Sequence, residues 1–234
     1  MNRHRRLLPL FALALLAPAP ASHAQTWLPL DDGFFWSYAG SFAAETRTVE
    51  GAVVVLGEPA KSILFSPSSS NEGLRNFWST AADGDVLLHG FVNPAIGGWG
   101  YDPPIVMLDA PLFVGKTWQQ TTHGRDLVTG DLLFTFDIAF QVVEEVVLAV
   151  PAGSFDAFGI GQIAPREFTN AAGAAFGLDG VRITEARRGT ASEYYSQNVG
   201  IVRDLADDTY DLLAYGSPTA VESLSWAGVK DLYR

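Results

Sequence analysis

Side chains that could do chemistry are sparse in this 234-residue chain. It contains no cysteine, and beyond the first 24 residues its histidines are His89, on an expected strand, and His123, in an expected turn. Transition-metal sites draw mainly on Cys and His, so few ligands are present even with help from Asp85 or Asp126. The G-x-S-x-G elbow of a serine nucleophile does not occur. We therefore predict no catalytic residue, no metal site and no cofactor.

Paired acidic residues are more numerous, but their spacing does not suit acid–base catalysis. Glu144-Glu145 and Asp207-Asp208 are direct neighbours, and neighbouring side chains on a strand point to opposite faces. Such carboxylates cannot act together on one substrate as acid and base. Asp83 and Asp85 have one-face spacing, yet they flank a turn glycine and lack the further ligands of a calcium loop. We interpret them as a solvated turn.

Aromatic side chains are the most distinctive feature, and most are expected to fill the interior. Trp99 and Tyr101 fall within Asn93–Pro104, a segment whose many Gly and Pro residues predict a long surface loop. If exposed there, they would be candidates for contacting a sugar, an apolar ligand or a protein. Trp78 and His89, from the preceding hairpin, complete the set of candidate ligand-binding residues.

The elements that must position these residues are strands. Short segments of alternating apolar and polar residues recur along the chain and are separated by turn residues. The clearest hairpin is Leu74–His89, which turns at Asp83-Gly84. The pattern predicts an all-β fold with little helix: a single antiparallel curved sheet, an open barrel or a sandwich of roughly ten to twelve strands.

Some segments are less regular. Leu132–Val150 contains 19 residues, more than a usual strand, so we expect two strands with a bend at Glu144-Glu145. Ala171–Gly180 is rich in Ala and Gly and predicts a loop or a single helical turn, followed by a strand over Val181–Arg187. Val221–Arg234 is expected to form a short amphipathic helix or an added strand.

The N-terminus has the three parts of a secretory signal peptide. Three arginines within the first six residues precede the apolar run Leu7–Leu16, and Ser22-His23-Ala24 places small residues where signal peptidase reads them. The run is shorter than the about 20 residues that span a bilayer. We therefore expect a leader over residues 1–24, cleaved after Ala24, and a single β-rich domain over residues 25–234, located in the periplasm or secreted.

Composition limits the partners of the mature chain. Without cysteine it can carry neither a lipid-anchoring lipobox nor disulfides, so stability must come from core burial. Of the 15 basic residues the leader removes three, and it removes none of the 26 acidic ones, which leaves a net charge of −14. Such an excess repels phosphate backbones and anionic lipid surfaces. We expect no nucleic acid partner and no membrane span or lipid anchor.

Several short motifs together resemble a broad group of exported bacterial proteins of unknown function. They are Trp27-Leu28-Pro29-Leu30 before Trp36-x-Tyr38, Pro111-Leu112-x-Val114-Gly115-Lys116-Thr117-Trp118, Val150-Pro151-Ala152-Gly153-Ser154-Phe155, and Tyr194-Tyr195 before Val199-Gly200-Ile201-Val202. That group has a VPAG-x-F turn before a strand and a GVG-x-V-like segment near its end. In plan it is similar to β-rich envelope carriers of the lipoprotein-localisation type, in which a curved sheet covers an apolar cavity. This chain lacks the long helices of those carriers.

These observations favour an exported, non-catalytic envelope protein that binds an apolar small molecule or an envelope protein against a concave sheet. A carboxylate-based hydrolase of envelope polymers is an alternative, and two carboxylates about 5–10 Å apart in one cleft would favour it. A surface-assembly component that uses sheet edges is another, and long uncovered edge strands would favour that.

Export can be tested on the full-length chain produced in a Gram-negative host. We expect the periplasmic or secreted product to begin at Gln25, as measured by mass spectrometry of the intact protein. Replacing Ala24 by Trp should block processing, because signal peptidase accepts only small residues at this position. An unprocessed wild-type chain recovered from the cytosol would contradict the prediction.

Overall fold

The described part of the chain forms twelve strands. The structure, a computed structural model, describes residues 26–41, 43–66, 73–95, 97–162, 190–205 and 209–217. Within these residues there is no helix, and the strands are β1 (Phe35–Gly40), β2 (Ala44–Val55), β3 (Glu58–Ser66), β4 (Arg75–Thr80), β5 (Val86–Asn93), β6 (Gly97–Leu108), β7 (Thr117–Asp126), β8 (Leu132–Val150), β9 (Gly153–Gln162), β10 (Glu193–Ser196), β11 (Gly200–Asp204) and β12 (Tyr210–Gly216).

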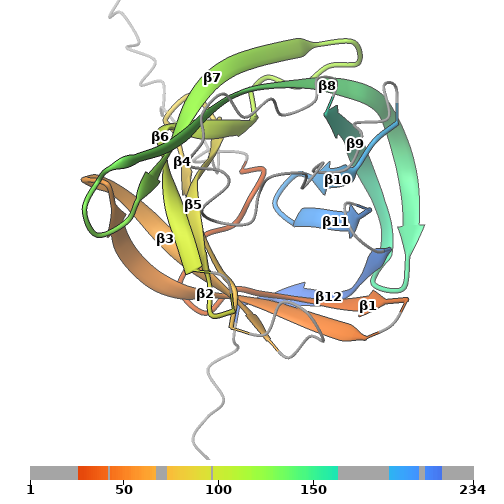
Figure 1. The fold of residues 1–234 in the computed structure, drawn as a ribbon. Coiled ribbons are helices and arrows are strands. Elements are labelled where there is room, and N and C mark those ends of the chain that lie inside the picture. The colour runs from red at the N-terminus through yellow and green to blue at the C-terminus, as the bar shows by residue number, and fades with distance from the viewer. Residues whose placement is uncertain are drawn as a thin grey trace, which may run out of the picture.

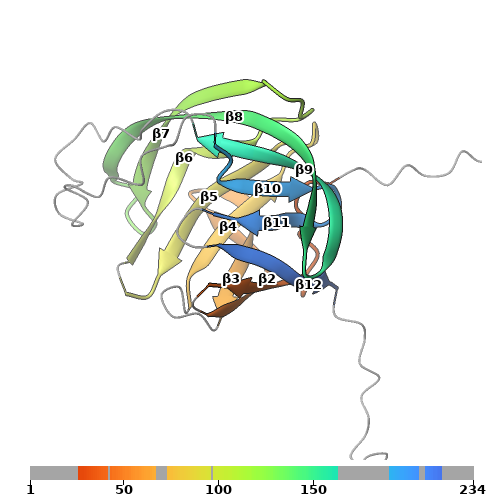
Figure 2. The ribbon, with the colours of Figure 1, turned by 90° about the vertical axis from the view of Figure 1, so that its right-hand side faces the viewer.

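These strands form one antiparallel sheet that closes on itself as a barrel (Figure 1). Each strand pairs with its neighbours in sequence, and β12 pairs with β1, for example Trp36 opposite Tyr215. We call this β1–β12 pair the seam. Figure 2 shows β10, β11 and β12 side by side along one wall of the barrel. The prediction of a single antiparallel sheet of ten to twelve strands is confirmed, and the structure adds that the sheet is closed.

Side-chain alternation separates the inner from the outer face of the barrel. On β1 the buried residues are Trp36 and Tyr38, and on the first half of β2 they are Glu45, Arg47 and Val49, each two residues from the next. The main hydrophobic core gathers aromatic side chains from all around the ring, among them Trp36, Tyr38, Phe65, Trp78, Trp99, Tyr101, Phe134, Phe136, Phe140, Tyr195 and Tyr210. The expectation that aromatic residues fill the interior therefore holds for these residues.

One prediction is wrong at strand β8. Leu132–Val150 is one strand of 19 residues rather than two. Its first part pairs with β7 and its second part with β9, and the register shifts by one residue between Val142 and Glu144. A bulge lets a strand bend without ending its pairing, which explains why the irregularity lies beside the expected bend although the strand continues.

A second prediction is wrong at strand β6. Most of the expected loop Asn93–Pro104 is strand. Its glycines serve close approach between strands: a Cβ added to Gly98 would lie 2.1 Å from the carbonyl oxygen of Phe91 on β5. Its prolines stand where the ladder to β7 stops, since β6–β7 pairing ends with Asp102 opposite His123. His123 is accordingly on a strand and not in a turn, and its Nδ1 hydrogen-bonds Thr135 Oγ1 at 2.8 Å.

Beyond that point, side chains of β7 replace the missing backbone bonds to β6. Trp118 Nε1 donates to the carbonyl of Val106 at 2.8 Å. The Gln120 amide donates to the carbonyl of Pro104 at 3.0 Å and accepts from the Val106 N–H at 2.8 Å. Proline has no N–H to give to a ladder, so these contacts keep β6 and β7 joined.

Four expectations lie outside the described residues: the loop at Ala171–Gly180, the strand at Val181–Arg187, the segment Val221–Arg234 and the acidic pair Asp207-Asp208. The leader over residues 1–24 also lies outside them. In the part of the chain that is described, no helix is long and apolar enough to cross a membrane.

Gly124 offers a test of the interior packing. A Cβ at this position would lie 2.2 Å from the ring of Phe134, its cross-strand partner on β8. We expect Gly124→Ala to destabilise the protein by about 1–3 kcal/mol, because the ring must leave its rotamer or the strands must separate. Urea denaturation measures the change. In a Phe134→Leu background the same substitution should cost clearly less, and an equal cost in both backgrounds would contradict this packing.

Candidate functional site

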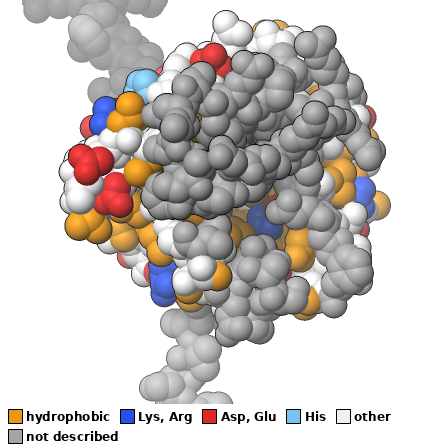
Figure 3. Space-filling view, in the orientation of Figure 1, with side chains coloured by type: hydrophobic (Ala, Val, Ile, Leu, Met, Phe, Trp, Pro, Cys, Tyr) orange, Lys and Arg blue, Asp and Glu red, His pale blue; other side chains and the backbone are white. Residues whose placement is uncertain are grey.

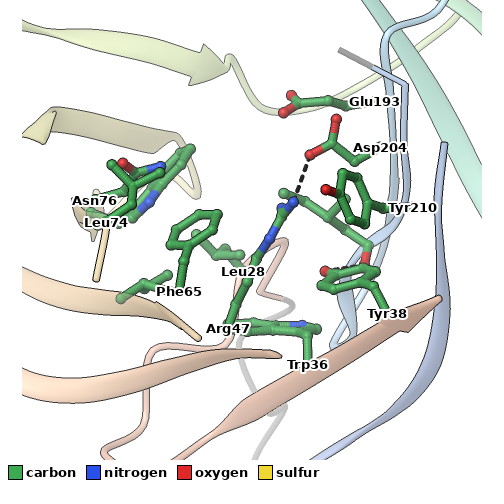
Figure 4. Close-up of a pocket in the computed structure, with 13 residues that line it drawn as sticks. Leu28, Trp36, Tyr38, Arg47, Phe65, Leu74, Asn76, Glu193, Asp204 and Tyr210 are labelled. Atoms are coloured by element: carbon green, nitrogen blue, oxygen red, sulfur yellow. Dashed lines mark hydrogen bonds and ion pairs between the residues drawn. The ribbon is translucent and has the colours of Figure 1, made fainter. Parts of the chain in front are cut away.

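A cavity of about 180 Å³ lies inside the barrel. Its walls come from β1, β2, β3 and β4 on one side of the seam and from β10, β11 and β12 on the other, together with Leu28 from the segment before β1. Figure 3 shows the molecule in the orientation of Figure 1. Among the described residues visible there, a basic side chain lies deep between hydrophobic ones. Figure 4 shows the lining residues themselves.

Arg47 is the central polar residue of the cavity, and it is 7% exposed. Its Nε donates to Glu45 Oε1 at 2.7 Å, and its Nη2 donates to Asp204 Oδ2 at 2.8 Å. Glu45 lies two residues earlier on β2, so both side chains share the inner face. Asp204 comes from β11, on the opposite side of the seam, 157 residues further along the chain. The guanidinium therefore joins a strand from the N-terminal part of the described chain to one from its C-terminal part.

Aromatic rings surround the same guanidinium. Arg47 Cζ lies 4.7 Å from the ring centroid of Tyr38, 4.8 Å from that of Phe65 and 6.0 Å from that of Tyr210. In Figure 4, Phe65 stands on one side of the Arg47 side chain, and Tyr38 and Tyr210 stand on the other. The negative faces of the rings attract the cation and replace part of the water that it lost on burial.

Burial and charge shift the ionisation of these groups in opposite ways. Burial alone lowers the pKa of Arg47, but the charge of Asp204 and the other nearby groups outweighs it, and the pKa is raised. Burial raises the pKa of Tyr38, so its hydroxyl stays protonated and donates to the carbonyl of Ile201 at 2.9 Å. Burial likewise raises the pKa of Tyr195, whose hydroxyl donates to Glu193 Oε2 at 2.8 Å. Arg47 and the two tyrosine hydroxyls therefore keep their protons over the physiological pH range.

Two carboxylates line the cavity together. Glu193 on β10 and Asp204 on β11 are direct cross-strand partners, and both side chains face the cavity beside Arg47 (Figure 4). Side chains of directly opposed residues start about 4.5–5.5 Å apart at Cβ. The two acids are 11 residues apart in the sequence, so no local spacing indicated that they would form a pair.

The four candidate ligand-binding residues do not form one site in the structure. Trp78 lines the cavity. Trp99 and Tyr101 are buried on β6, 7% and 6% exposed, and pack edge-on against Phe134 and Phe136. Their interpretation as exposed loop residues is wrong, because the surrounding glycines and prolines belong to a strand.

His89 is buried as well, 4% exposed, and does not line the cavity. Its Nε2 lies 2.7 Å from Ser79 Oγ, within hydrogen-bonding distance, and burial lowers its pKa. The neutral form is thus favoured, and the residue acts as a hydrogen-bonded strand histidine. Among the described residues, no group of three His, Cys, Asp or Glu side chains is placed to hold a metal ion.

Sequence reasoning missed Glu45, Arg47, Glu193 and Asp204 as site residues. One signal was present: Glu45 and Arg47 precede Val49 at the two-residue spacing of an inner face, so charges occupy core positions of an alternating strand. Charged residues at such positions are rarely buried unless paired. Their partners on β10 and β11 could not be read from spacing.

Comparison of the chain with protein-family models, with curated proteins and with solved structures gave no match.

The contribution of the Arg47 ion pairs to the stability of the protein can be measured by substitution. Replacing Arg47 by Met should destabilise the protein by about 3–5 kcal/mol, because the partner carboxylates lose their cation in a buried setting. The triple variant Glu45→Gln, Arg47→Met, Asp204→Asn should recover much of this loss. Urea denaturation of the mature chain measures both.

A matched control uses an exposed pair of the same type. Arg125 Nε donates to Asp102 Oδ2 at 2.7 Å, with side chains 32% and 54% exposed. Solvent screens such a pair, so Arg125→Met should cost at most about 1 kcal/mol. Equal costs at Arg47 and Arg125 would show that the interior pairs are not formed as described.

Proposed function

We propose that this is an exported, non-catalytic binding protein that holds a small, largely apolar molecule inside its barrel. The observation that carries the proposal is an interior cavity with aromatic walls around one buried guanidinium. Ligand sites typically combine apolar and aromatic walls with a few fixed polar groups that orient the ligand. Arg47 is such a group, since its carboxylate and aromatic neighbours hold it in one position.

The volume of the cavity limits the size of the ligand. A cavity of about 150 Å³ is known to accept benzene in another protein, whereas drug-sized ligands occupy pockets of about 300–1,000 Å³. At about 180 Å³ this cavity suits a molecule the size of one six-membered ring. A long acyl chain could not lie wholly within it, which argues against an enclosed lipid cargo of the kind that the resemblance to envelope carriers implies.

One observation favours the hydrolase alternative. Glu193 and Asp204 share one cavity, as an acid and its partner would in a carboxylate-based hydrolase. Against it, Asp204 accepts a hydrogen bond from Arg47 and Glu193 accepts one from Tyr195, so both carboxylates have structural partners. Soluble fragments released from cell-wall polymer by the wild type, and not by Glu193→Gln, would favour the hydrolase.

The assembly alternative gains no support from the sheet. Each of the twelve described strands pairs on both sides, so the ring offers no long uncovered edge for another chain to join.

Ligand-observed NMR with a panel of ring-sized neutral compounds tests the binding function on the mature chain. We expect members of the panel to bind the wild type and to lose binding in Leu74→Trp, which fills the cavity from the residue just before β4. Leu74→Met keeps the volume and should keep binding. The proposal fails if no compound binds at millimolar concentration, or if binding survives Leu74→Trp unchanged.

A further inference from the structure

The two edges of the Arg47 guanidinium are used differently. The edge formed by Nε and Nη2 donates to Glu45 and Asp204. Nη1, on the other edge, makes no hydrogen bond with any residue in the described ranges, although the side chain lines the cavity and is only 8% exposed. A buried guanidinium has five N–H donors, and leaving donors without acceptors is costly. This second edge therefore has donors to offer to a bound molecule.

The rings decide the direction from which a ligand can approach these donors. Tyr38 and Phe65 lie within 4.8 Å of Arg47 Cζ, on opposite sides of the side chain (Figure 4). With both faces of the guanidinium covered, a ligand reaches it only in the plane, at the Nη1 edge. In-plane approach selects a hydrogen-bond acceptor and excludes stacking on the cation.

The charges of the described lining residues decide the charge of that acceptor. They are one guanidinium and two carboxylates, Glu193 and Asp204. An anionic ligand placed at Nη1 would also face these carboxylates in a poorly screened interior, where like charges repel strongly. A cationic ligand would meet the Arg47 donors without an acceptor to give them. A neutral oxygen acceptor satisfies the donors and meets neither penalty.

We propose that the ligand is a neutral, ring-sized molecule bearing a carbonyl or ether oxygen, and that this oxygen accepts a hydrogen bond from Arg47 Nη1. The apolar ring lies against the aromatic and aliphatic wall, which includes Phe65, Leu74 and Trp78. This inference rests on the proposed binding function and narrows its ligand class.

Four probes of nearly equal size test it on the mature chain. Cyclohexanone carries the acceptor, methylenecyclohexane has the same shape without it, cyclohexylammonium is cationic and cyclopentanecarboxylate is anionic. Dissociation constants are measured by NMR titration of protein labelled with ¹⁵N-arginine. The ratio of the ketone to the alkene affinity is compared between the wild type and the Glu45→Gln, Arg47→Met, Asp204→Asn variant, which cancels the difference in hydration of the two probes.

We expect this ratio to be about tenfold or more higher in the wild type, the size of one hydrogen bond to a charged donor. The ketone alone should shift the Arg47 side-chain signal of the wild type, a readout that does not need the variant to fold. Both charged probes should bind more weakly than the ketone.

Three results would overturn the inference, and they separate it from the binding function. If ketone and alkene both bind and the ratio is the same in the two proteins, or if the Arg47 signal does not respond to the ketone, the acceptor claim fails while interior binding stands. If a charged probe binds best, the neutral ligand class is wrong. If neither neutral probe binds, the binding function fails together with the inference.

Discussion

The ion pair between Arg47 and Asp204 spans the seam at which the barrel closes. Arg47 is on β2 and Asp204 on β11, and β1 and β12 pair with each other between them. The cavity exists because strands from the two ends of the described chain become neighbours there. Its walls, its polar centre and its two carboxylates all come from strands within reach of this seam.

Buried charges often stabilise a barrel less effectively than apolar side chains would. Removing a guanidinium and carboxylates from water costs several kcal/mol per ion, and well-packed apolar side chains of similar volume are often as good or better. Here the cost is offset by two short ion pairs and by the rings of Tyr38, Phe65 and Tyr210. The arrangement gains little stability, and it fixes one donor edge toward a cavity, as the proposed binding function requires. The aromatic core elsewhere in the barrel keeps the scaffold rigid around it.

The solvent exposure of alternate side chains explains which strands could be predicted from the sequence and which could not. Alternation predicted the hairpin Leu74–His89, and the observed strands β4 and β5 lie within a few residues of it, because inward and outward positions differ in solvent exposure. It failed at β6, whose Gly and Pro residues are typical of loops. In the barrel those glycines allow close strand contact, and side chains of β7 bridge the gap left by the prolines. Both compensations depend on neighbouring strands and leave no mark within the segment itself.

The sequence by itself determined the class of the protein: short alternating strands, an aromatic interior, and a chain without cysteine that must rely on core burial. Those properties follow from the chemistry of each residue and its near neighbours. Only the tertiary structure decided that the sheet closes, that Trp99 and Tyr101 are buried, and that Arg47 meets Asp204. The reason is distance along the chain, since the partners of the site are more than 150 residues apart and come together only through the register of the whole ring.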